Sequence, residues 1–91
     1  MKVLNNTEIE SYLEELDNWI LDGDAIKREW IFRDFSEAMD FINMIAVIAE
    51  ANNHHPEINN IYNQVSLRFK THDMDGITEK DINIAKEIDT L

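Results

Sequence analysis

The sequence predicts an α+β fold: a single domain over residues 1–91 with the element order α-β-β-α-β-β-α, in which a four-stranded antiparallel sheet carries three helices on one face. Two observations lead to this prediction. Apolar side chains follow a helical period in three segments and alternate in the segments between them. The alternating segments form two adjacent pairs, each with a turn signal in its middle, so each pair is expected to form a hairpin. The length of 91 residues fits one domain.

The first helix is expected from about residue 7 to 16. Thr7 and Glu10 have the spacing of a capping box, in which each side chain bonds the other residue's backbone N–H group. The apolar residues of this segment share one helical face and are Ile9, Tyr12, Leu13 and Leu16.

A hairpin is expected next, because Asp22-Gly23 is a typical turn between two β-rich runs. Successive side chains of a strand point to opposite faces of the sheet. The second run therefore presents one mostly apolar face, formed by Ile26, Arg28, Trp30 and Phe32.

The segment 35–53 has the clearest helical pattern, and Asp34 or Ser36 is expected to cap its start. One apolar stripe consists of Phe35, Ala38, Met39, Ile42, Ile45, Ala46 and Ala49. A second stripe on another side consists of Phe41, Met44 and Ile48. One sheet cannot cover both stripes, so the second stripe predicts a homo-oligomer assembled through this helix. The alternative is that the other two helices of the same chain cover it.

The second hairpin is expected around a turn at Asn63, because Val65, Leu67 and Phe69 alternate with polar residues after it. A turn centred on Asn63 would pair Ile61 with Val65 and bring His54 or His55 opposite His72. The last helix is expected to begin after Thr78, which is a suitable cap with Asp81 at the third helical position.

Composition narrows the functional classes. The net charge is −11, from 8 basic and 19 acidic residues. Because phosphate contacts need clustered Lys and Arg, nucleic acid and anionic lipid are not expected as direct partners. No apolar run approaches the roughly 20 residues that span a bilayer, and the start of the chain lacks a secretory pattern. There is no cysteine, so a cytoplasmic protein without a membrane partner is expected.

The candidate functional residues are three histidines with nearby carboxylates. Pro56 disfavours helical geometry at His55, so the long helix must end near His54, and the two neighbouring histidines should point in different directions. Glu50 lies four residues before His54, on the same helical face. With His72 nearby, these groups suit proton transfer near neutral pH.

Two alternatives remain open from the residues alone. Each histidine could be an ordinary surface or hydrogen-bonded residue. The three histidines could also bind zinc together with Glu50 or Asp75, although the spacing matches no familiar zinc pattern.

The same residues resemble the pterin-4a-carbinolamine dehydratase family. The match consists of Glu50, His54-His55-Pro56, Tyr62, His72 and Asp81 at the family's spacing, within the stretch "HHPEINNIYNQVSLRFKTHDMDGITEKDINIA". The upstream stretch "WIFRDFSEAMDFI" fits as well, and the resemblance covers nearly the whole chain. It implies the α+β fold predicted above. It also implies dimers or tetramers that meet through the 35–53 helix.

The implied reaction removes water from the 4a-carbinolamine of tetrahydrobiopterin and gives quinonoid dihydropterin, with a pterin as substrate and with no metal and no organic cofactor. By this resemblance His54, His55 and His72 are catalytic, with His55 and His72 the main acid–base pair. Glu50 would hold His54, and Asp81 would brace the loop that carries His72.

The resemblance also implies the substrate-binding residues, which are Asn53, Pro56, Lys70, Thr71 and Asp73. Two positions depart from the family: Asn53 stands where animal members commonly have an acidic residue, and Ile58 stands where an aromatic residue is common. Animal relatives also act as dimerisation cofactors for a homeodomain transcription factor. A non-catalytic dimerisation or assembly cofactor, which binds a protein partner through its long helix, is therefore the alternative function.

Overall fold

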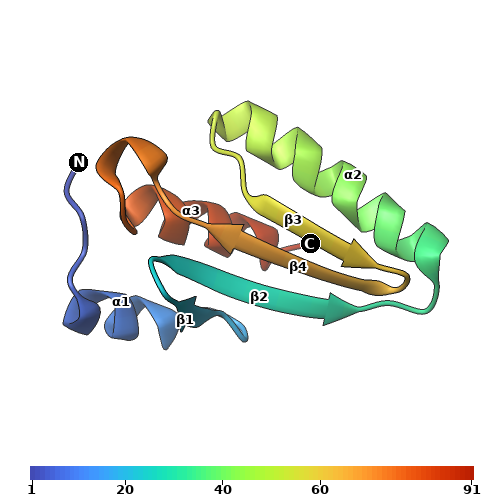
Figure 1. Ribbon diagram of the computed structural model, residues 1–91, viewed down its shortest axis with the longest axis horizontal. Helices are drawn as coiled ribbons and strands as arrows, with labels where there is room; N and C mark the ends of the chain where they lie inside the picture. Colours follow the sequence, from blue (N-terminus) through green and yellow to red (C-terminus); the bar gives the residue numbers. More distant parts are fainter.

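The computed structural model describes all 91 residues and has the predicted order of helices and strands (Figure 1). A short 3-10 helix, η1, is the one element that the sequence pattern did not predict. The elements are α1 (Asn6–Leu13), β1 (Ile20–Asp22), β2 (Ala25–Ile31), α2 (Phe35–Asn52), β3 (Glu57–Ile61), β4 (Gln64–Phe69), η1 (His72–Met74) and α3 (Glu79–Ile88).

The four strands form one antiparallel sheet in the order β1-β2-β4-β3. Both hairpins have two-residue turns, and each turn begins with a residue of positive φ, Gly23 at 63° and Tyr62 at 52°. Ile61 pairs with Gln64, so the predicted pairing of Ile61 with Val65 is wrong by one residue. A turn of two residues, rather than one centred on Asn63, causes this shift.

All three helices pack on the same face of the sheet. Along β4 the residues Val65, Leu67 and Phe69 are buried, whereas Ser66 and Arg68 between them face the other side and stay half-exposed. The buried strand residues belong to one core of 17 side chains to which every helix contributes. One core member from each helix is Ile9, Phe41 and Ile82, in chain order. The opposite face of the sheet is left open.

Helix α1 begins earlier and ends earlier than predicted. Its N-cap is Asn5, whose side chain accepts from the Glu8 backbone N–H at 2.9 Å while the Glu8 carboxylate accepts from the Asn5 N–H at 3.1 Å. The predicted capping box of Thr7 and Glu10 is therefore wrong, since Asn caps at least as well as Thr and lies two residues upstream.

Helix α2 begins after the Asp34 cap and ends at Asn52, followed by Asn53 in the left-handed conformation that closes many helices. Its burial pattern corrects the prediction about the two apolar stripes. Phe41 and Ile48 of the second stripe are buried within the same chain, so only Met44 of that stripe is exposed. The sheet and α3 cover this side. The first stripe is divided, because Ala38, Ile45 and Ala49 are buried whereas Phe35 and Ala46 are exposed.

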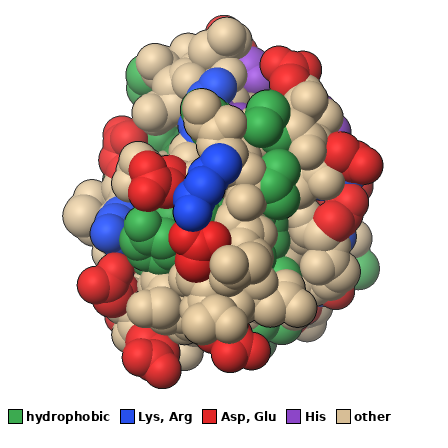
Figure 2. All heavy atoms as spheres, turned by 90° about the vertical axis from the view of Figure 1, so that its left-hand side faces the viewer, with side chains coloured by type: hydrophobic (Ala, Val, Ile, Leu, Met, Phe, Trp, Pro, Cys, Tyr) green, Lys and Arg blue, Asp and Glu red, His purple; other side chains and the backbone are tan.

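Carboxylates dominate the surface, and Figure 2 shows acidic side chains spread over the visible face with few lysines and arginines among them. The strands are tied together by Arg68, which bonds Asp22 at 2.7 Å and also contacts Glu57 and Asp24. The Glu57 and Asp22 carboxylates raise the pKa of Arg68. No helix combines the length and the apolar character needed to cross a bilayer.

Candidate active site

A cavity of about 400 Å³ lies where the C-terminal end of α2, the start of β3, η1 and the start of α3 meet. Its nine lining residues are Asn53, His54, His55, Pro56, Glu57, Thr71, His72, Asp73 and Lys80. All three histidines of the chain thus line one cavity, although they come from two distant segments of the sequence. The predicted cluster is present, and its geometry differs from the predicted one in three respects.

The first difference concerns His54, which is paired with Asp81 and not with Glu50. His54 Nε2 lies 2.5 Å from Asp81 Oδ1, and both residues are buried. Because an ionised carboxylate can only accept, Nε2 carries the proton of this bond. The imidazole also stacks on Phe69 at a centroid distance of 5.6 Å. These contacts fix the ring and leave Nδ1 as its other polar atom.

Asp81 is a fully buried carboxylate with a complete set of donors. Its Oδ2 accepts from the Thr71 hydroxyl at 3.0 Å and from the Thr78 backbone N–H at 2.9 Å. The latter bond belongs to the predicted cap of α3, which the structure confirms. Asp81 therefore links the His54 ring to the start of α3. The Thr71 hydroxyl is used inside this network, although Thr71 also lines the cavity.

The second difference is the partner of Glu50. Its Oε1 lies 2.6 Å from His55 Nε2, and both side chains are more than half exposed. Glu50 is therefore paired with His55, and the prediction that it holds His54 is wrong. The helix ends at Asn52, so the helical i, i+4 spacing of Glu50 and His54 no longer applies. The predicted divergence of the two neighbouring histidines is consistent with their separate carboxylate partners.

The third difference is the position of His72, which lies in η1 and not opposite His54 across the hairpin. Strand pairing begins at Glu57 with Arg68 and does not reach the histidines. Instead, a β-bridge between Thr71 and Gly76 closes the η1 loop, and Asp75 in the left-handed conformation ends η1. His72 is exposed at the cavity wall.

Most of the predicted substrate-binding residues line the cavity, and Lys70 does not. Lys70 Nζ pairs with Asp24 at 2.8 Å and with Asp75 at 3.5 Å, and these carboxylates raise its pKa. Sequence reasoning also missed two lining residues, Glu57 and Lys80. Lys80 precedes Asp81 on α3, and its Nζ reaches the Asn53 carbonyl at 3.4 Å. The sequence signal that could have identified Lys80 is its position next to Asp81, which was already a candidate site residue.

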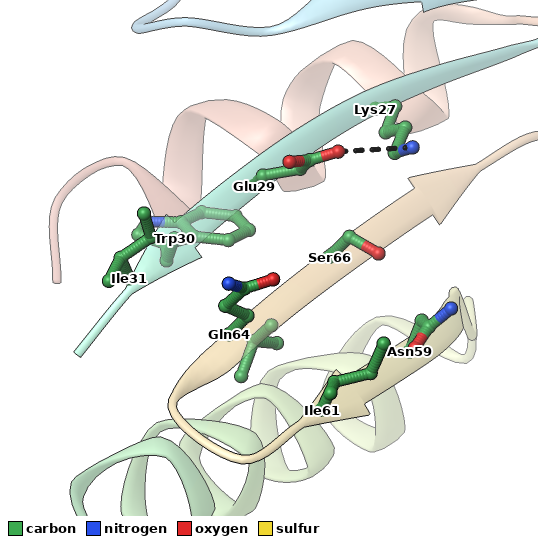
Figure 3. A pocket seen from close by; sticks show the side chains of 9 residues that line it. Lys27, Glu29, Trp30, Ile31, Asn59, Ile61, Gln64 and Ser66 are labelled. Carbon is green, nitrogen blue, oxygen red and sulfur yellow. Dashed lines mark ion pairs between the residues drawn. The ribbon is translucent and has the colours of Figure 1, made fainter. Parts of the chain in front are cut away.

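The zinc alternative has no ligand set, since no three His, Asp or Glu side chains are arranged to hold a metal ion. A second hollow of about 310 Å³ lies on the open face of the sheet (Figure 3). There Lys27 and Glu29 pair with each other at 3.2 Å, and exposed Ile31 and Ile61 flank Gln64. This hollow contains no histidine, so it offers no proton-transfer group suited to neutral pH.

The fold and the cavity together define an α+β protein with a histidine-lined cavity. The chain matches the family model described as "Pterin 4 alpha carbinolamine dehydratase" over residues 2–91. It therefore belongs to that family, which confirms the resemblance seen in the sequence.

Individual relatives match along their whole length. A relative from Sulfurisphaera tokodaii, named provisionally as a pterin-4-alpha-carbinolamine dehydratase, is 42% identical over 100% of this chain and 98% of its own. A relative from Thermomicrobium roseum with the same name is 43% identical over the same shares. The crystal structure of a "transcriptional coactivator/pterin dehydratase" from Brucella melitensis superposes with a TM-score of 0.91 at 40% identity, covering 98% of this chain and 97% of that one.

Proposed function

We propose that this chain is a 4a-hydroxytetrahydrobiopterin dehydratase that works by histidine acid–base catalysis. In this reaction the bond from carbon 4a to its hydroxyl breaks, the proton on N5 leaves, and an N5–C4a double bond forms. The products are quinonoid dihydropterin and water, with no change of oxidation state. The observation that carries the proposal is the cavity that gathers all three histidines in a member of this family.

The reaction needs one group that donates a proton to the hydroxyl and one that accepts the N5 proton. His55 and His72 suit these tasks, because both are exposed at the cavity and can exchange protons with solvent. Glu50 orients the His55 ring through the 2.6 Å contact at Nε2, which leaves Nδ1 for the substrate. His72 has no carboxylate partner, so its ring is free to turn toward the pterin.

His54 has a different role in this proposal. Its Nε2 is committed to Asp81, so the ring is a rigid part of the cavity wall with one remaining nitrogen toward the pterin. Asn53 and Pro56 form the wall beside it, and Asp73 lies on the side of His72. Lys80 joins these residues as a cation at the cavity that we add to the substrate-binding set. Lys70 leaves the set because its ammonium group is engaged elsewhere.

The test is the dehydration of freshly made 4a-hydroxytetrahydropterin, followed by its ultraviolet decay. We expect the chain to accelerate the decay and His72→Ala to slow it by about 10²–10⁴-fold. Met74→Ala is the matched control, since Met74 lies in the same 3-10 helix but does not line the cavity. A wild-type rate no better than buffer would refute the proposal.

A second candidate function is binding of a protein partner through α2, which need not involve catalysis. The outward apolar residues of this helix favour it: Phe35, Met39, Ile42 and Ala46 follow one another at helical spacing. Phe35 is half exposed, and Ile58 on the neighbouring edge strand adds to the apolar surface. The same surface would serve a homodimer or homotetramer assembled through the 35–53 helix.

Light scattering tests this assembly. We expect the wild type to be larger than one chain and Ala46→Glu to reduce its mass. Ala51→Glu is the control, because Ala51 is exposed on another side of the same helix. A wild-type protein with the mass of one chain would contradict the predicted homo-oligomer. A partner-binding role without catalysis is favoured only if the carbinolamine assay also fails.

A further inference from the structure

Another cavity, which shares no residue with the histidine cavity, is lined by residues from the end of β2, the first half of α2 and the C-terminal end of α3. Its volume is about 300 Å³, at the lower end of the range for small-molecule sites. Its apolar lining consists of Trp30, Phe32, Phe41, Met44, Ile88 and Leu91. The dehydration proposed above uses none of these residues.

Three aromatic rings form a continuous wall of this cavity. The Phe41 ring lies 4.8 Å from the Trp30 ring and 5.0 Å from the Phe32 ring, measured between centroids. Trp30 and Phe32 remain partly exposed, although both pack against the core. A flat ring inserted beside them would gain apolar burial and ring-to-ring contact.

Of the three carboxylates at the cavity, two have hydrogen-bond partners within the chain and one has none. Asp89 already accepts from Trp19 at 2.8 Å and pairs with Arg28 at 2.7 Å. Glu37 is engaged with the Arg33 backbone N–H. Asp40, by contrast, is exposed and has no hydrogen-bond or ion-pair partner in the chain. One carboxylate at the mouth is thus free to pair with a cation from outside.

Arg28, by contrast, has a hydrogen-bond donor without a partner. Its guanidinium group stacks on Trp30 at 4.7 Å, and Nη1 is bonded to Asp89, but the buried Nε–H has no acceptor. Leaving a buried donor without a partner is unfavourable. Arg28 lines the cavity, so its guanidinium group is the cationic donor there for a ligand oxygen. Arg28 brings one positive charge, whereas Glu37, Asp40 and Asp89 bring three negative charges, so the lining favours a cationic ligand.

We propose that this cavity is a second binding site and that it takes a small phenolic amine. The ligand would carry one aromatic ring, an oxygen acceptor at one end and an ammonium group at the other. The ring would lie against Trp30, Phe32 and Phe41, the oxygen would accept from the Arg28 guanidinium group, and the ammonium group would pair with Asp40. Trp30 and Phe32 are partly exposed and Asp40 is unpaired, so these groups are available to a ligand.

Tyramine is the probe, with binding followed by tryptophan fluorescence and by amide chemical shifts around Trp30. We expect saturable binding with a Kd between about 10 µM and 1 mM, the range for a ligand of this size. Phenethylamine lacks the oxygen and 4-ethylphenol lacks the amine, so each should bind at least threefold more weakly. 4-Hydroxyphenylacetate reverses the charge and should bind weakest of the four.

Two variants locate the site. Met44→Lys places a cation at the half-exposed edge of the cavity and should weaken tyramine binding at least tenfold, whereas Asp40→Asn should weaken it about two- to fivefold. Val47→Lys is the control, since Val47 is exposed on the same helix but does not line the cavity. All three substituted residues are exposed, so the fold should persist, as circular dichroism would verify.

Several outcomes would overturn the proposal: no saturable binding of tyramine, equal binding of 4-ethylphenol, or undiminished binding by Met44→Lys. If tyramine fails to bind and Met44→Lys instead changes the oligomeric state, the cavity is a protein contact and the ligand assignment is wrong. The dehydration assay tests the histidine cavity, so its result does not bear on the proposed binding of a phenolic amine.

Discussion

Two neighbouring histidines in this chain each lie against a carboxylate, and the two pairs differ in burial. The His54–Asp81 pair is buried, with a contact of 2.5 Å and two further donors to the carboxylate, the Thr71 hydroxyl and the Thr78 backbone N–H. The His55–Glu50 pair has nearly the same contact, 2.6 Å, but both side chains lie mostly in solvent. The chemistry of the groups is alike, so their surroundings must set their roles.

The comparison shows how one histidine doublet can serve structure and catalysis together. A buried hydrogen-bonded pair costs much to break, because the remaining polar partner is left without solvation, and this rigidity suits a cavity wall. An exposed pair contributes little to stability and leaves the ring open to solvent and substrate. Asn53 in the left-handed conformation, directly before the doublet, allows the chain to turn and separate the two rings.

The largest expected effect is on stability, at Asp81. Asp81→Ala removes the carboxylate that pairs with His54 and caps α3, so we expect the free energy of unfolding to fall by about 3–5 kcal/mol. Urea unfolding measures this loss. Glu79→Ala is the matched control, because Glu79 lies in the same first turn but is exposed, and it should cost less than about 1 kcal/mol. Equal losses in the two variants would mean that burial of Asp81 contributes nothing special.

Double-mutant cycles compare the two pairs directly. Replacing His54 and Asp81 singly and together should give a coupling energy of about 1.5–3 kcal/mol in urea unfolding. The same cycle on His55 and Glu50 should give about 0.2–1 kcal/mol, because solvent screens that pair. If both cycles gave the same value, the contrast between a structural and a catalytic pair would fail.

Glu50→Gln isolates the orienting role of the exposed carboxylate. We expect the dehydration rate to fall about two- to fivefold, in proportion to the small energy of an exposed pair. The free energy of unfolding should change by less than about 0.5 kcal/mol. A change confined to stability would place Glu50 outside the catalytic machinery.

The smallest expected effect is acid sensitivity from exposed carboxylates outside both pairs. Lys70 lowers the pKa of Asp24 below its ordinary value of 3.8, the α2 backbone N–H lowers that of Asp34, and Lys2 lowers that of Glu8 from 4.5. A carboxylate whose pKa is lower in the folded state stabilises the fold at a pH above its unfolded-state pKa. This stabilisation is lost as the pH falls through the folded-state pKa. Stability should therefore decline below about pH 4. Asp24→Asn should make the decline shallower in urea unfolding measured between pH 5 and pH 2, and an unchanged slope would contradict the assignment.

The sequence predicted the fold well where local patterns decide it. Alternation along β4 predicted Val65, Leu67 and Phe69 on the buried face, and the Thr78–Asp81 spacing predicted the cap of α3. The predictions failed where two neighbouring residues or two turn lengths are almost equally favourable in energy. Asn5 competes with Thr7 as the cap of α1, and a two-residue turn competes with one centred on Asn63.

The sequence predicted that the three histidines come together but not how they pair with carboxylates. Glu50, His54, His55 and His72 lie at or beside one cavity, as expected. Which carboxylate reaches which ring depends on the backbone between Asn52 and Glu57, where no helical or strand spacing applies. The exposed side of α2 was likewise not predicted, because helical spacing identifies apolar stripes without showing which of their residues the rest of the chain covers.

The central claim is that His55, the exposed member of the doublet, transfers protons in pterin dehydration, while His54 holds the cavity. The most direct test is the 4a-carbinolamine dehydration rate of His55→Ala at a temperature where its circular dichroism matches the wild type. We predict a rate lower by about 10²–10⁴-fold with an unfolding free energy within about 1 kcal/mol of the wild type. A folded His55→Ala that retains the wild-type rate would contradict the account.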